Sequence, residues 1–322
     1  MNFLGYSHWF ISIRISQLKD HSISMFQAIY ATSIVTKYLD TATVKVSKKF
    51  YKTTFPVDMI FTTEDASTSD KQVEKLIREY NIHYIACIGS LIYLLSTRVD
   101  LSFAVHKLEK FSANPGKVHF GGLIHLFRYI RDNKTLGLKY YADLNDVPVN
   151  DLLRQSNIKT KNHLMDFSDS NWKDCPDTGR IIGAYIIFYQ GGPIDHGTHV
   201  PRPVAQSIAE SEYNASCTAG MALAHFRMLI HDFLNKDPDI FPEEAPFIVF
   251  NSKSVMCMSN NGNYTKHTRH IERRIHFVTN GEKCKMHKID WCEGGLQLAD
   301  IGTKNVGEPD LTPRIKYIMV RL

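Results

Sequence analysis

The sequence predicts an α/β protein in which helices dominate the first half and strands and helices alternate in the second. Residues 71–132 place apolar side chains at helical spacing, whereas residues 180–189 (RIIGAYIIFY) are β-branched and aromatic. The expected order across residues 163–322 is β–β–β–α–β–α–β–α, which is typical of an α/β domain. A chain of 322 residues suggests roughly two domains. We therefore predict a first domain over 1–140, a linker over 141–162 and a second domain over 163–322.

The composition is that of a folded protein without disulfide or zinc frameworks. Hydrophobic residues make up 43% and charged residues 22%, which excludes wholesale disorder. The net charge of +5 is too small to indicate a nucleic-acid partner by itself. The six cysteines form no CxxC pair, which favours a reducing compartment. With neither a spanning apolar run nor a signal-peptide pattern, we expect no membrane and a cytoplasmic protein, with the nucleus as the alternative.

In the first half, alternating Trp9, Ile11, Ile13 and Ile15 predict a strand over 9–15, close to the start of the chain. Residues 40–72 are rich in Thr, Ser, Lys and Asp without periodicity, and we interpret them as an exposed connection. Asp100 is a candidate helix cap. The expected helices cover 24–39, 71–95, a stretch after Asp100 that ends at 114–116, and 117–132.

In the second half, short β-branched and aromatic runs alternate with amphipathic stretches. The longest amphipathic stretch, 210–234, has an apolar face that contains Leu223, Phe226 and Phe233. Gly191-Gly192 is expected to be a turn. The expected strands are 164–167, 180–189, 203–208, 246–250 and 288–291, and the expected helices are 210–234, 252–260 and 296–304.

Three acidic residues of the second half lie at the ends of predicted elements. Asp169 follows the first strand, Glu212 lies in the first turn of the long helix, and Asp300 starts the last helix. Carboxylates that converge in this way suit two Mg²⁺ ions for phosphodiester hydrolysis. On composition alone, however, acids at element ends are more commonly helix caps and solvated charges.

Longer sequence words favour the catalytic interpretation. FSDSNWKDCPDTGRIIGAYIIFYQGGPI, VAQSIAESEYNAS, KHTRHIERRIHFV and GGLQLADIGTK resemble the ribonuclease H domain of copia-type retrotransposon Pol polyproteins. YIACIGSLIYLLSTRVDLSFAVHKLEKFSANPGKVHF resembles the segment after the reverse-transcriptase palm of the same polyprotein. The resemblance implies a ribonuclease-H-like mixed sheet with flanking helices. It also implies that a truncated, mostly helical thumb and connection region precedes this sheet.

By the same resemblance, Asp169, Glu212 and Asp300 are the catalytic carboxylates and the ligands of a two-Mg²⁺ site, with Glu210 beside Glu212. The fourth ligand position, after PFIVF, holds the neutral Asn251. This substitution predicts a degenerate site. Val99, where the family usually has proline, and His199-Val200-Pro201, where it usually has a lysine-containing turn, are further departures.

The polymerase centre is not expected in this chain. The palm carries a Tyr-x-Asp-Asp hairpin, and no such word occurs here. In the segment that starts at Tyr141, Asp143 and Asp146 are separated, and the segment fits the linker better. We therefore expect that the chain does not polymerise DNA alone.

Basic residues concentrate in 261–290, where seven Lys and Arg face three acids. Lys266, Arg269, Arg273 and Arg274 are the candidate nucleic-acid contacts. A solvated basic loop and strand explains them equally well, and the same two readings apply to Lys107, Lys110, Lys117, Arg128 and Arg131. His267, His270 and His276 fit a family signature better than a metal cluster.

Together these features predict a truncated, degenerate Pol protein. The ancestral reaction is Mg²⁺-dependent hydrolysis of RNA in RNA–DNA hybrids during transposition. The expected partners are such a hybrid or another nucleic acid, and other Pol parts. Two alternatives stay open: a non-catalytic nucleic-acid-binding module, and a functionless genomic relic.

Overall fold

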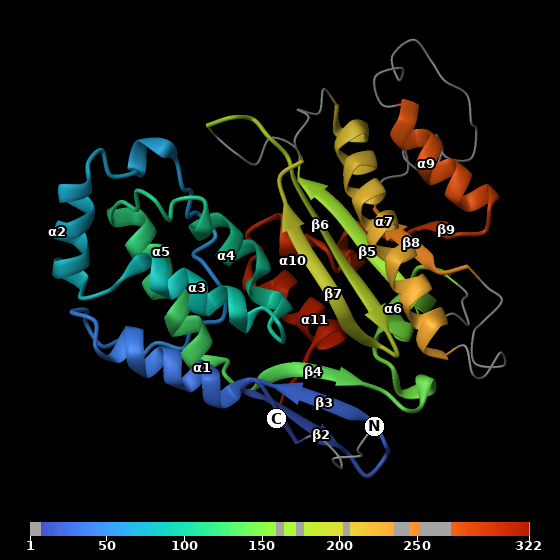
Figure 1. The fold of residues 1–322 in the computed structure, drawn as a ribbon, viewed down its shortest axis with the longest axis horizontal. Helices are drawn as coiled ribbons and strands as arrows, with labels where there is room; N and C mark the ends of the chain where they lie inside the picture. Colours follow the sequence, from blue (N-terminus) through green and yellow to red (C-terminus); the bar gives the residue numbers. More distant parts are fainter. Residues whose placement is uncertain are drawn as a thin grey trace. The chain divides into compact units, whose positions relative to one another are not determined.

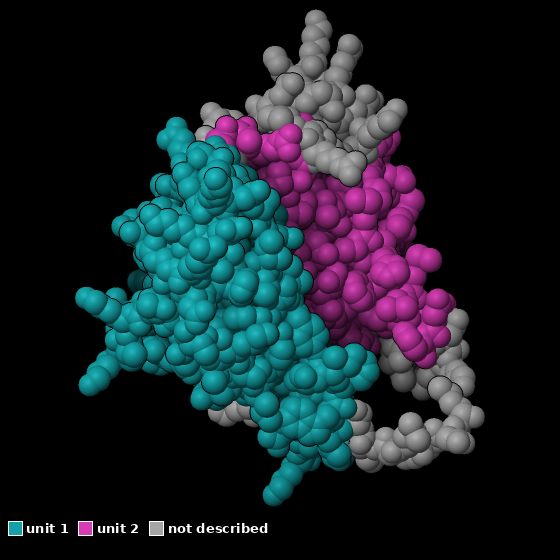
Figure 2. All heavy atoms as spheres, turned by 60° about the vertical axis from the view of Figure 1, so that its left-hand side comes forward, with its two compact units in different colours: residues 1–142, 305–322 teal, residues 143–304 magenta. Residues whose placement is uncertain are grey.

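The computed structural model describes residues 8–158, 164–171, 177–201, 207–234, 245–251 and 272–321. The chain forms two compact units, one of residues 1–142 with 305–322 and the other of residues 143–304 (Figure 2). The last residues join the first unit because their strand pairs with a strand of that unit. These limits differ from the predicted domain boundaries, which assigned residues 305–322 to the second domain.

Unit 1 contains a mixed arrangement of an antiparallel sheet and helices. The strands are β1 (Trp9–Phe10), β2 (Ile13–Gln17), β3 (Ile23–Phe26), β4 (Leu136–Tyr140) and β10 (Val320–Arg321), and they lie in the order β1-β2-β3-β4-β10. The single strand expected over 9–15 is wrong. Ile11 and Ser12 have φ values of 44° and 62°, so the chain turns there and forms a hairpin. Strands β4 and β10 were not predicted.

The helices of unit 1 follow the apolar periodicity with shifted limits. They are α1 (Ala28–Val35), continued by a π-helical turn (Thr36–Asp40), then α2 (Asp70–Tyr80), α3 (Tyr84–Leu94), α4 (Ser102–Glu109), α5 (Lys117–Asp132) and α11 (Glu308–Ile318), with 3₁₀ turns at Thr63–Asp65 and Val99–Leu101 (Figure 1). The helical stretch expected over 71–95 forms the pair α2 and α3, which are separated where Asn81 adopts a left-handed conformation with φ 54°. The expected helix over 24–39 begins as strand β3 instead.

A buried ion pair lies at the centre of unit 1. Arg98 donates two hydrogen bonds to Asp100, of 2.8 and 2.7 Å, and both side chains are almost fully buried. The Tyr129 hydroxyl donates to the same carboxylate at 2.7 Å. Asp100 therefore does not cap α4, contrary to the prediction, since its oxygens are used inside the core. Val99, the departure from proline, is buried at the start of the same 3₁₀ turn.

Unit 2 contains a mixed sheet with helices. The strands are β5 (Leu164–Asn171), β6 (Ile182–Tyr189), β7 (Gly192–His199), β8 (Phe247–Phe250) and β9 (Lys288–Trp291), in the order β7-β6-β5-β8-β9. Strands β5, β6 and β7 pair antiparallel, whereas β8 pairs parallel with β5 and β9 parallel with β8. The third strand is thus 192–199, directly after a turn at Gln190 and Gly191 with positive φ. The expected strand at 203–208 is wrong at its end, where α7 begins at Ile208, and residues 202–206 lie outside the described ranges.

The helices of unit 2 include one long helix that packs on the sheet. They are α6 (Val149–Gln155), α7 (Ile208–Leu234), α9 (Glu272–Lys283) and α10 (Asp300–Thr303), with 3₁₀ turns at Leu144–Asp146 and Gly294–Leu296. The helix expected over 252–260 lies outside the described residues. Within the described ranges, no helix is both long and apolar enough to cross a membrane.

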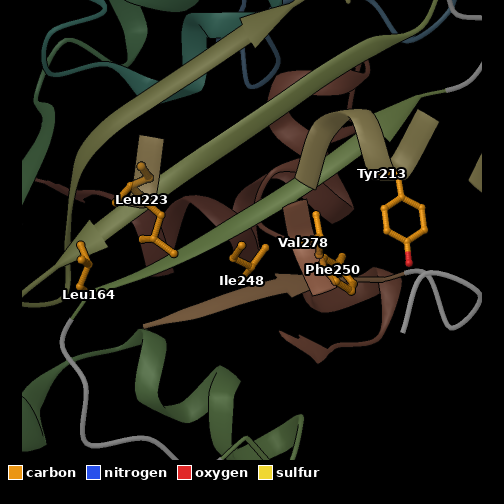
Figure 3. Close-up of a cluster of buried hydrophobic side chains, with 7 residues drawn as sticks. Leu164, Tyr213, Leu223, Ile248, Phe250 and Val278 are labelled. Carbon is orange, nitrogen blue, oxygen red and sulfur yellow. The ribbon is translucent and has the colours of Figure 1, made fainter. Parts of the chain in front are cut away.

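The core of unit 2 lies between α7, α9 and one face of the sheet. Leu164 and Ile248 come from the neighbouring strands β5 and β8, Leu223 comes from α7, and Val278 comes from α9 (Figure 3). Side chains alternate along a strand, so the residues next to Leu164 and Ile248 point to the opposite face. This alternation gives Asp169 and Leu164 opposite faces of β5, and it determines where the predicted site lies.

We expect Asp100→Ala to destabilise the protein by about 3–5 kcal/mol, because it leaves the buried Arg98 guanidinium without its counter-ion. Urea denaturation of the full chain, followed by circular dichroism, measures this loss. The control is Glu74→Ala, which removes an exposed pair with Arg78 and should cost less than about 1 kcal/mol. An Asp100→Ala protein as stable as the control would contradict the assigned role of the ion pair.

Candidate carboxylate site

Asp169 lies near the carboxyl end of β5, on the face opposite the α7 core, and is only 3% exposed. The Thr303 hydroxyl of α10 donates a hydrogen bond of 2.5 Å to Asp169 Oδ2. Thr303 is itself fully buried. The first strand therefore places the carboxylate as predicted, and α10 supplies a donor that holds its orientation.

Glu212 lies one turn inside α7, since the helix begins at Ile208 rather than at residue 210. Its side chain is 6% exposed, and its Oε2 atom accepts no hydrogen bond from the described residues. Ser170 Oγ donates to Ser211 Oγ at 2.9 Å, which joins β5 to α7 beside this carboxyl group. Burial, and next the charge of Asp169, raise the pKa of Glu212 to about 9; the charge of Asp300 contributes to this rise, and the hydrogen bond from Ser170 opposes it.

Asp300 is the first residue of α10 and is 2% exposed. The Lys304 ammonium lies 2.9 Å from Asp300 Oδ2 and is partly exposed to solvent. Gly302 allows α10 to pack closely on β6, because a Cβ atom there would lie 2.7 Å from the Ala184 Cβ. Gln297 fixes the approach to α10 by donating to the Ser168 carbonyl oxygen at 3.0 Å.

Asn251 directly follows β8, as predicted, and is partly buried. Strands β5 and β8 pair in parallel with Met165 opposite Phe247 and Phe167 opposite Val249. The pairing ends there, and Asp169 and Asn251 each lie two residues beyond its last pair. Its backbone oxygen accepts a hydrogen bond of 3.0 Å from Trp291 Nε1. The residue that directly follows β8 is therefore neutral, and its role as a fourth ligand position stays a prediction.

The three carboxyl groups interact electrostatically without forming a ligand set as they stand. The negative charges of Asp169 and Asp300 both raise the pKa of Glu212. The buried Glu212 Oε2, which accepts no hydrogen bond from the described residues, is a hard donor atom that suits Mg²⁺. However, Thr303 and Lys304 already engage Asp169 and Asp300. Among the described residues, no group of three or more His, Cys, Asp or Glu side chains is arranged to hold a metal ion. The donor chemistry fits Mg²⁺ only if Lys304 leaves Asp300.

The side chains of the four predicted nucleic-acid contacts lie outside the described part of the chain. Lys266 and Arg269, like His267 and His270, lie outside the described residues. Arg273 and Arg274 lie in α9, so this part of the basic segment is helical rather than the loop and strand that were expected. Their side chains are outside the description, and their role stays a prediction.

His199 is the first residue of the segment 199–201, in which the sequence differs from the lysine-containing turn that is usual in the family. His199 ends β7, and burial lowers the pKa of its imidazole. Its ring lies over Gly183 of β6, where an added Cβ would come within 3.1 Å of it. At this position β7 therefore ends on a partly buried histidine.

Sequence reasoning missed the residues that support the acids. Thr303 and Lys304 are adjacent to the predicted Asp300 in the word ADIGTK, and their placement three and four residues after it was the available signal. Ser170 follows Asp169 directly. Gln297 carried no signal, because its partners are backbone oxygens of strands far away in the sequence.

The chain is similar in sequence to several known proteins. The chain is 26% identical over 241 residues to the retrovirus-related Pol polyprotein from transposon TNT 1-94 of Nicotiana tabacum, and the match covers 73% of this chain and 16% of that protein. The corresponding polyprotein from transposon RE2 of Arabidopsis thaliana is 24% identical over 221 residues, which cover 69% of this chain and 14% of that protein. An uncharacterized mitochondrial protein of Arabidopsis thaliana is 31% identical over 94 residues, which cover 29% of this chain and 70% of that protein.

Two of these relatives are retrovirus-related Pol polyproteins from transposons. No family model matches the chain. The chain is homologous to retrovirus-related Pol polyproteins from copia-type transposons, at 24–26% identity over about 70% of its length. It spans about one-sixth of the length of the curated polyproteins that it matches.

We expect Glu212→Gln to remove a pH-dependent loss of stability. The folded-state pKa of about 9 lies above the ordinary value of 4.5, so the folded protein keeps a proton that the unfolded chain releases. The contribution of this carboxyl is therefore complete below about pH 4.5 and is lost as the pH rises through about 9. The variant should match the wild type at pH 4.5 and unfold at higher denaturant concentration at pH 9.

Unfolding midpoints in urea at several pH values measure this difference, without added metal. Glu282→Gln, on α9 of the same unit, is the control and should leave the pH dependence unchanged. Parallel pH profiles for Glu212→Gln and the wild type would show that Glu212 is not held in a raised-pKa environment.

Proposed function

We propose that unit 2 is a ribonuclease-H-like domain of the Pol lineage, whose ancestral reaction was hydrolysis of the RNA strand of RNA–DNA hybrids. The observation that carries the proposal is the burial of Asp169, Glu212 and Asp300 within mutual electrostatic reach at one end of β5. The mixed sheet order β7-β6-β5-β8-β9, with β5 central, supports it. The Pol relatives of the chain support the nucleic-acid substrate class.

The chain's own residues suggest how such a site would work. Asp169, Glu212 and Asp300 would hold Mg²⁺, which when bound stabilises the developing charge on phosphorus and activates water. Thr303 orients the Asp169 carboxylate by its hydrogen bond. Glu212 has to release its proton before both of its oxygens can serve as anionic ligands, so metal binding would release protons to solvent.

Two features of the site act against efficient hydrolysis. Asn251 supplies an amide where a carboxylate would add a full negative charge, and at 4 Å with an effective dielectric of about 20 one such charge interacts by roughly 4 kcal/mol. If half of that interaction were specific to the transition state, the rate would fall by more than about tenfold. Lys304 also neutralises Asp300 from within the protein. We therefore propose a degenerate site with weak or no activity.

Asn251→Asp tests the hydrolytic proposal. The substitution supplies a carboxylate at the predicted fourth ligand position, and we expect cleavage of a labelled RNA–DNA hybrid in Mg²⁺ to rise at least about tenfold over the wild type. The gain should vanish in the double variant Asn251→Asp, Asp169→Asn, which is the control for contaminating nuclease. A folded Asn251→Asp protein that binds the hybrid but does not cleave it would contradict a hydrolytic centre at these residues.

A non-catalytic nucleic-acid-binding module is the second candidate function, and the Lys304–Asp300 ion pair favours it. In this pair the Lys304 ammonium binds Asp300, the carboxylate that would otherwise bind a metal ion. In this case the wild type should bind the hybrid with affinity that falls as salt rises, without cleavage. Absence of binding at low salt would exclude the module.

A further inference from the structure

Four lysines of unit 1 lie in a segment that packs on α5 and is neither helix nor strand, and we call Lys45, Lys48 and Lys49 of this segment the lysine row. Residues 41–57 contain Lys45, Lys48, Lys49 and Lys52 and no acidic residue. All four lysines are exposed. Within the described part of the chain, none of Lys45, Lys48 and Lys49 forms an ion pair with a carboxylate, whereas Lys52 pairs with Glu308 at 2.5 Å. The segment was predicted only as an exposed connection.

The polar face of α5 holds this segment through its backbone. Arg128 donates to the Lys45 carbonyl oxygen at 2.9 Å, and Arg131 donates to the Ser47 carbonyl oxygen at 3.0 Å. The Tyr51 amide donates to Asp132 Oδ2 at 2.8 Å. Arg128 and Arg131, which were weighed as nucleic-acid contacts or solvated charges, therefore position the lysine row. Because its backbone is already ordered, the row loses little backbone conformational entropy when it binds.

A cavity of about 280 Å³ lies beside the row in the same unit. Phe50, which is 52% exposed, lines it together with Tyr129 and Asn133. The charged lining consists of the cations Lys316 and Arg321 and of Lys52, which pairs with the Glu308 carboxylate in the same lining. The side walls are anchored, because Arg321 Nη2 donates to Asn133 Oδ1 at 2.9 Å and Asn133 Nδ2 donates to the Tyr51 carbonyl oxygen at 2.9 Å.

An exposed aromatic ring next to a row of cations is the arrangement that binds single-stranded nucleic acid. Cations neutralise successive phosphates, and an aromatic face stacks on a base without requiring a particular sequence. The cavity is slightly smaller than the about 300–1,000 Å³ of typical small-molecule clefts. It therefore suits one base better than a larger ligand.

We infer that Lys45, Lys48 and Lys49, with the Phe50 cavity, form a binding surface for single-stranded nucleic acid that is separate from the carboxylate site. The lysine row contacts the phosphate backbone, and Phe50 stacks on an unpaired base beside Lys316 and Arg321. The inference does not depend on hydrolysis in unit 2. It places a nucleic-acid contact in residues 45–50, whereas the sequence predicted such contacts in the basic segment 261–290.

Fluorescence anisotropy of a labelled single-stranded oligonucleotide on the full chain tests the lysine row, with EDTA present so that hydrolysis does not contribute. We expect the double variant Lys48→Glu, Lys49→Glu to bind more than about tenfold more weakly, and the slope of log affinity against log salt to shrink by about 1.4, because two phosphate contacts are lost. The matched control is Lys71→Glu, Lys75→Glu, which makes the same charge change on the exposed face of α2.

The base contact has its own variant. Phe50→Ala should weaken binding of the single strand by about fivefold or more while a blunt duplex is little affected. Phe10→Ala, which removes another exposed aromatic ring, is the control. Thermal melting confirms that each variant is folded.

Three results would overturn the inference. Unchanged binding in Lys48→Glu, Lys49→Glu is one, and equal weakening in the α2 control is another, since it would show an effect of net charge alone. Binding of phosphatidylserine vesicles without oligonucleotide binding is the third. Failure of Asn251→Asp to cleave a hybrid would leave these outcomes unaffected, so the two proposals can fail separately.

Discussion

Three carboxyl groups share a space in unit 2 from which the protein excludes most water, and their mutual repulsion has to be offset. The protein offsets it in three ways. The Thr303 hydroxyl binds Asp169, the Lys304 ammonium binds Asp300, and Glu212 keeps its proton because burial and the neighbouring charges raise its pKa to about 9. Around this cluster α10 packs closely on β6. Gln297 donates hydrogen bonds to backbone oxygens of β5 and β8. Lys304 therefore supplies a cation from within the protein beside these carboxyl groups.

Much of this geometry could be predicted from the sequence, because the acidic residues stand at the ends of strongly patterned elements. The run 164–171 places Asp169 by strand alternation, and the amphipathic stretch up to residue 234 identifies α7. Asn251 follows a short apolar strand, β8, which pairs in parallel with β5.

The rest could not be predicted, for reasons that are tertiary. Strand β7 has the sequence GPIDHGTH, which lacks a β-branched and aromatic pattern and is ordered by pairing with β6. Strand β10 has two residues and exists only because β4 is its partner. Asp100 looked like a helix cap because local sequence cannot show that Arg98 and Tyr129 meet it in the core. The ordered segment 45–52 has no period at all, since side chains of α5 hold its backbone.

We infer that Asp169, Glu212 and Asp300 form one electrostatically coupled cluster. Its most direct test is the ¹³C chemical shift of the Glu212 carboxyl carbon, followed by NMR as a function of pH in the metal-free protein. We expect a pKa near 9 in the wild type and a clearly lower value in Asp169→Asn, because one of the charges that opposes ionisation is removed. A Glu212 pKa near 4.5 that does not respond to Asp169→Asn would contradict it.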